Sequence, residues 1–114
     1  MATIMPCIPE CLAYSILKTL RDRMPGITDA LETYCWLEYG RRFVDIIRDD
    51  IAEAMRVILE SLEPETAKYA VDTIIYHLSG GQPMKIQEAS KYVREGRLEM
   101  VRSILCVYST SPER

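Results

Sequence analysis

Apolar residues between Arg41 and Leu62 recur every three or four positions, which is the repeat of an α-helix. The largest of them are Val44, Ile47, Ile51, Met55, Ile58 and Leu62. Charged residues fill most of the positions between them, so a helix over this stretch has one apolar side and one polar side. We therefore expect one long amphipathic helix over about 41–62, with the rest of the chain covering its apolar side.

The same repeat continues upstream and predicts two shorter helices. One covers about 9–24 and ends at Pro25-Gly26, because proline cannot continue a helix and glycine favours the turn. The other covers about 29–39, with Thr28 as its expected N-cap. Gly40 follows directly, and we expect it to break or bend the chain before the long helix.

Downstream of Leu62 the pattern predicts three more helices. They begin at Pro64, Pro83 and Leu98, and glycines end the first two. No segment alternates apolar and polar residues for long enough to form a strand, and no hairpin turn pair is present. The sequence thus predicts an all-α fold: a compact bundle of five or six helices around a long central helix.

The length of 114 residues fits a single domain, and a hydrophobic content of 48% is enough for a core. We expect residues 1–8, a lead-in, and 109–114, a tail, to be loosely ordered. No apolar run approaches the length of a membrane-spanning helix, and the first residues do not resemble a signal peptide. A cytoplasmic, intracellular protein is the expectation.

The chain contains no asparagine and only two glutamines, Gln82 and Gln87. Thermolabile amides are depleted in proteins from hyperthermophiles, whereas charged residues are enriched. We therefore expect a hyperthermophilic archaeon, or a virus of one, as the source.

Four cysteines are present, at Cys7, Cys11, Cys35 and Cys106. Intracellular proteins of hyperthermophiles often contain disulfides, so one or two bonds are possible here, and four cysteines allow three pairings. Buried, unreactive thiols are the alternative for Cys35 and Cys106, which lie in apolar helical runs. A zinc site is a weaker hypothesis, because no second cysteine pair or adjacent histidine accompanies Cys7 and Cys11.

No residues form a pattern typical of catalysis or of cofactor or metal binding. His77, the only histidine, has no acidic residue on its own helical face, and its place near a helix end suits the helix dipole. The string from Leu78 to Gln82 (LSGGQ) is similar to the signature of ABC-type ATPases, but no GxxxxGK[ST] loop accompanies it. We interpret Gly80-Gly81 as a helix stop and expect a protein that is not an enzyme.

Aromatic residues gather at the end of the second predicted helix, at Tyr34, Trp36 and Tyr39, and Arg41 and Arg42 follow. Tryptophan and tyrosine contribute strongly to interfaces, and arginines can surround such a patch. Packing inside the domain is the alternative explanation. Our hypothesis is that these five residues bind a partner, which makes the protein a homodimer or a subunit of a larger complex.

A different function class is suggested by the C-terminal charge. The net charge of the chain is −3, which argues against general nucleic-acid binding. Residues 85–114, however, carry six basic and four acidic side chains, a balance of +2. A nucleic-acid-binding accessory or regulatory protein is therefore the alternative, with a helical hairpin that contacts phosphates through Lys85, Lys91, Arg94, Arg97 and Arg102.

Overall fold

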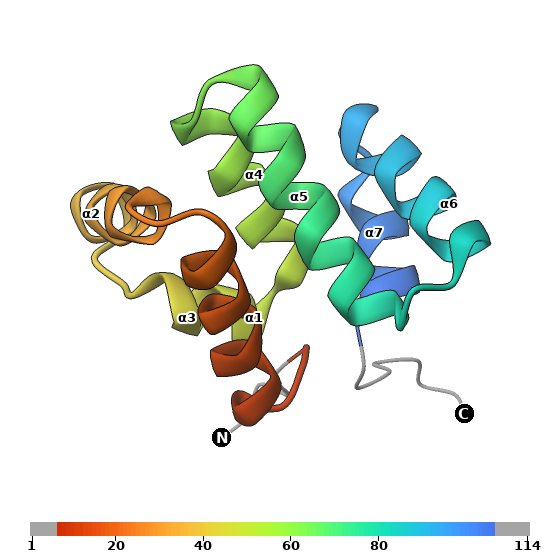
Figure 1. Cartoon of the computed structure of the whole chain (residues 1–114), viewed down its shortest axis with the longest axis horizontal. Helices are drawn as coiled ribbons and strands as arrows, with labels where there is room; N and C mark the ends of the chain where they lie inside the picture. The colour runs from red at the N-terminus through yellow and green to blue at the C-terminus, as the bar shows by residue number, and fades with distance from the viewer. Residues whose placement is uncertain (1–6, 107–114) are drawn as a thin grey trace.

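This computed structural model describes residues 7–106 of the chain, and this range contains seven α-helices joined by short loops (Figure 1). They are α1 (Glu10–Arg23), α2 (Ile27–Tyr39), α3 (Phe43–Asp49), α4 (Ile51–Ser61), α5 (Pro64–Ser79), α6 (Pro83–Arg94) and α7 (Leu98–Leu105). The predicted all-α fold is confirmed, with seven helices in the described range where five or six were expected.

Helix α4 lies at the centre of the bundle. It packs against α2, α3, α5, α6 and α7, and α1 completes the fold by packing on α2, α3 and α5. Figure 1 shows α4 and α5 between two groups, with α1, α2 and α3 on one side and α6 and α7 on the other. Every apolar residue of α4 except Leu59 is fully buried: Ile51, Ala52, Ala54, Met55, Val57 and Ile58. The second half of the stretch 41–62 is therefore the core element that its pattern predicts.

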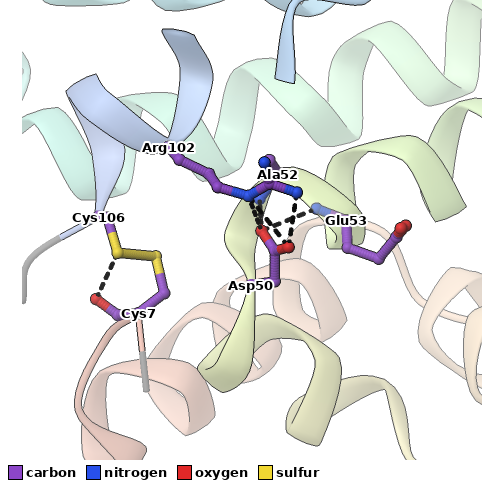
Figure 2. Close-up of a disulfide and its surroundings, with 6 residues drawn as sticks. All are labelled: Cys7, Asp50, Ala52, Glu53, Arg102 and Cys106. Carbon is purple, nitrogen blue, oxygen red and sulfur yellow. Dashed lines mark hydrogen bonds and ion pairs between the residues drawn. A yellow bond between two sulfur atoms is a disulfide. The ribbon is translucent and has the colours of Figure 1, made fainter. Parts of the chain in front are cut away.

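The prediction of one continuous helix over 41–62 is wrong, because the chain breaks at Asp50. This residue has extended backbone angles (φ −157°, ψ 96°), and its carboxylate accepts hydrogen bonds from the backbone N–H groups of Ala52 (3.1 Å) and Glu53 (3.3 Å). Aspartate is a favoured N-cap, so it can start a new helix in the middle of an apolar repeat. The Arg102 guanidinium holds the same carboxylate from α7, with its Nε atom 2.9 Å from one oxygen (Figure 2).

Helix boundaries elsewhere follow the glycines and prolines of the sequence, with small differences. Gly40 breaks the chain as expected: it ends α2 in the left-handed conformation (φ 65°), and its N–H donates to the Trp36 carbonyl. Thr28 is not the N-cap of α2, because the helix begins at Ile27 and Thr28 is buried in its first turn. Gly26, with φ 90°, takes the N-cap position instead, since glycine adopts that conformation without a steric penalty.

A disulfide joins Cys7 to Cys106, so the two ends of the described range are linked across 99 residues (Figure 2). Cys7 and Ile8, which we assigned to a loosely ordered lead-in, are buried, and both of their N–H groups donate to the carbonyl oxygen of Arg48. Residues 1–6 and the tail 109–114 lie outside the described residues. Cys11 is an exposed free thiol and Cys35 a buried one.

Candidate association surface

Helix α2 covers the bundle with one side and leaves the other side exposed. Leu31 and Cys35 are fully buried on its inner side. Its exposed residues are Asp29, Ala30, Thr33, Trp36, Leu37 and Glu38. Four of these, Ala30, Thr33, Trp36 and Leu37, carry no charge and lie on one side of the helix, because Thr33 is three or four residues from each of the others. This side is here called the outer face of α2, and the exposed Asp29, four residues before Thr33, lies at its N-terminal end.

Trp36 and Leu37 are the large residues of this outer face. Their side chains are 63% and 75% exposed, which places them among the most exposed large apolar residues of the described chain. An isolated exposed apolar residue is common, but two adjacent large ones on one helix face are typical of an interaction site. Leu37 was not among the residues that we predicted, although its four-residue distance from Thr33 places it on the Trp36 side of the helix.

Tyr34 and Tyr39 have a different environment from Trp36. Both are half-buried against the core, and their rings meet edge to face with centroids 6.4 Å apart. Both hydroxyl groups donate to the Glu60 carboxylate of α4, at 3.2 and 3.5 Å. Desolvation and this hydrogen bond raise the pKa of the Tyr34 hydroxyl. The two tyrosines thus fix α2 onto α4, and the predicted aromatic cluster divides into two inward residues and an outward Trp36.

Arg41 and Arg42 lie in the loop between the end of α2 and the start of α3. The Arg41 guanidinium pairs with Asp49 on α3. Arg42 lies 3.9 Å from the Glu32 carboxylate, and its side chain remains 58% exposed. Exposed ion pairs contribute little to stability, so the Arg42 guanidinium stays available to a second carboxylate.

Four of the five basic residues of the alternative hypothesis are exposed, and the fifth, Arg102, is half-buried. Lys85, Lys91 and Arg94 are exposed along α6. Arg97 stacks 5.4 Å from the centroid of the Tyr92 ring and lies 3.8 Å from the Glu95 carboxylate. Arg102 is engaged with Asp50, as described above, so its charge is neutralised within the fold. Helices α6 and α7 form a hairpin, as expected. Two of its arginines, Arg97 and Arg102, make contacts within the bundle, and Arg94 is exposed.

Within residues 7–106, no three side chains of the His, Cys, Asp and Glu types gather in the way that a metal site requires. In the same range, no helix has both the length and the apolar character needed to cross a bilayer. Comparisons with protein-family models, with characterised proteins and with solved structures gave no match to this chain.

Proposed function

We propose that this protein acts by self-association, as a homodimer in which the outer faces of α2 from two copies pack against each other. The exposed pair Trp36 and Leu37 is the observation that carries the proposal. Burying large apolar side chains is the main favourable contribution to such an interface, and tryptophan is prominent among the residues that dominate binding. The same contact could join this chain to a larger assembly.

The order of side chains on the outer face favours a second copy as the partner. Small residues, Ala30 and Thr33, occupy its first half, and large ones, Trp36 and Leu37, occupy its second half. If two such helices meet antiparallel about a twofold axis near Thr33, the large side chains of each copy lie over the small residues of the other. A twofold interface requires this kind of self-complementary patch.

Charges at the two ends of α2 favour the same antiparallel orientation. Asp29 lies in the first turn of α2, and the exposed Arg42 follows its last turn. In an antiparallel pair centred near Thr33, Arg42 of one copy lies about five residues, roughly 8 Å along the helix axis, beyond the point opposite Asp29 of the other, a distance that the long arginine side chain can span. A parallel pair instead places like charges together. Complementary charges of this kind select orientation more than they add affinity.

One helix face is smaller than the roughly 800 Å² per partner of a typical stable interface, so we expect a dissociation constant in the micromolar range. Sedimentation velocity over roughly 5 to 500 µM protein should show a species of twice the 13.1 kDa chain mass that dissociates on dilution. Leu37→Glu should abolish this species. Met84→Glu is the matched control, because Met84 is 78% exposed but lies on α6.

A charge exchange tests the orientation separately. Asp29→Lys and Arg42→Glu should each weaken the dimer, and the double variant should recover part of the loss. A monomer at all concentrations, or equal effects of Leu37→Glu and Met84→Glu, would refute the proposal. If the protein instead purifies with nucleic acid that about 0.5 M salt removes, the exposed residues Lys85, Lys91 and Arg94 become the better candidates.

A further inference from the structure

A polar cleft lies between α1 and α5, away from the outer face of α2. Its volume is about 460 Å³, which is within the range of small-molecule sites. The residues that line it are Thr19, Arg23, Thr73, Tyr76, His77 and Gly80. Five of these six have polar side chains, and three of the six residues are exposed, so the cleft opens to solvent and offers hydrogen-bonding groups to a ligand.

The two helices bring a guanidinium and an imidazole into this cleft. Helices α1 and α5 pack on each other and run in opposite directions (Figure 1). Side chains on a helix lean toward its N-terminus, so Arg23 leans back toward Thr19, and His77 leans back toward Thr73. Because the helices are antiparallel, the two side chains lean toward each other over the middle of the cleft.

Hydrogen bonds already fix several of the polar groups. The Ser15 hydroxyl oxygen lies 3.2 Å from Nε2 of His77, although Ser15 itself does not line the cleft. When the serine O–H donates to Nε2, the other ring nitrogen of His77, Nδ1, carries the hydrogen and can donate to a ligand. The hydroxyls of Thr19 and Thr73 donate to carbonyl oxygens of their own helices, at 2.9 and 2.8 Å. Each threonine oxygen can therefore still accept a hydrogen bond from a ligand hydroxyl.

The charge balance of the cleft is positive. No carboxylate is among the described residues that line it, and Arg23 contributes a full positive charge. The nearest acidic residue on α5, Asp72, lines the neighbouring groove between α5 and α6, where it accepts a hydrogen bond from Ser90 at 3.4 Å. An anionic group in the α1–α5 cleft thus meets donors and no facing carboxylate.

We propose that the α1–α5 cleft binds a small phosphomonoester that carries hydroxyl groups beside its phosphate. The planar guanidinium of Arg23 matches two phosphate oxygens, and the imidazole of His77, whose Nε2 is held by Ser15, donates a further hydrogen bond from Nδ1. The oxygens of Thr19 and Thr73 accept from the ligand hydroxyls. This combination favours such a ligand over inorganic phosphate, which has no carbon-borne hydroxyl groups that can reach the two threonines while its oxygens face Arg23.

Isothermal titration calorimetry with ribose 5-phosphate and with inorganic phosphate tests the proposal. Ribose 5-phosphate should bind saturably and more tightly than inorganic phosphate. Arg23→Gln should weaken its binding roughly tenfold or more, the loss expected for a charge-assisted bidentate contact. Arg21→Gln is the matched control, since Arg21 is also exposed in the last turn of α1 but does not line the cleft, and it should change the affinity less than about twofold.

Three results would overturn the inference. They are the absence of saturable binding of ribose 5-phosphate, equal affinities for the two probes, and equal losses in Arg23→Gln and Arg21→Gln, which would indicate general attraction to positive charge. Because Arg23 is exposed, the Arg23→Gln variant should fold, and its circular dichroism spectrum checks this. The dimer contact on α2 involves none of these residues, so the outcome is independent of the association proposal.

Discussion

Among single residues, the two free cysteines differ most in their surroundings. Cys11 is exposed on α1, whereas Cys35 is fully buried on the inner side of α2. Burial, followed by the nearby Glu32 carboxylate, raises the pKa of the Cys35 thiol to about 11. Only the thiolate reacts with thiol reagents, and at pH 8 roughly one Cys35 side chain in a thousand is ionised, even before access is considered. Cys35 is thus the buried thiol that one of our sequence hypotheses described.

Ellman's reagent at about pH 8 should consequently modify Cys11 and leave Cys35 intact. The folded protein should release one equivalent of the thiolate product, and the protein unfolded in guanidinium without a reductant should release two. In Cys11→Ser the folded protein should release none. Two fast equivalents from the folded wild type would mean that Cys35 is accessible and that the inner side of α2 does not pack closely on the bundle.

At the scale of helices, Asp50 has two structural roles at once. It caps the first turn of α4, and it binds the Arg102 side chain, whose Nη2 atom lies 2.8 Å from the second carboxylate oxygen. The hydrogen bond to Asp50 raises the pKa of the Arg102 guanidinium, so this arginine stays charged. The residue therefore connects the break between α3 and α4 to α7, which is distant in sequence.

Asp50→Ala removes both contacts, and we expect it to destabilise the protein by about 1–3 kcal/mol, the sum of a lost cap and a partly exposed ion pair. Asp50→Asn keeps a side-chain acceptor for the cap and should cost about 1 kcal/mol or less. Urea denaturation measures both differences. In the Arg102→Ala background, Asp50→Ala should cost less than in the wild type. Equal costs in both backgrounds would show that the ion pair adds nothing.

The apolar pattern is sufficient to predict helices here, but it cannot locate the break between α3 and α4. Ile47 and Ile51 are four residues apart, which is the spacing expected within one helix. Both are buried although Asp50 starts a new helix between them, so the apolar pattern looks the same with and without the break. A capping aspartate in the middle of the repeat was the available signal. Gly40 was easier to interpret, since a glycine after an apolar run is a common helix end.

The candidate sites depend on relations between helices that a linear pattern lacks. Composition favoured the aromatic segment, but it could not show that Tyr34 and Tyr39 reach Glu60 on α4 while Trp36 faces outward. Likewise, Ser15 and His77 are 62 residues apart, and their contact requires the packing of α1 on α5. A search for an acidic partner of His77 within its own helix could not find a serine on another helix.

For the whole molecule, the Cys7–Cys106 disulfide is the contact of longest range, and it sits where the two ends of the described chain meet. The Cα atoms are 5.0 Å apart, a separation that suits a disulfide. Closing a loop of about 100 residues restricts the unfolded chain, which in the chain-entropy model stabilises the fold by about 4–5 kcal/mol, while measured losses on removing native disulfides are about 2–5 kcal/mol.

Reduction should consequently lower the free energy of unfolding by about 2–5 kcal/mol, a large part of the total for a domain of this size. Guanidinium denaturation with and without a phosphine reductant measures the change. Cys7→Ser should match the reduced wild type and respond no further to the reductant. Cys11→Ser, which leaves the bond intact, should keep the full response. If Cys7→Ser were as stable as the oxidised wild type, the disulfide would have no stabilising role. The burial of Ile8 and the backbone hydrogen bonds of residues 7 and 8 to Arg48 would then be sufficient to hold this end of the bundle.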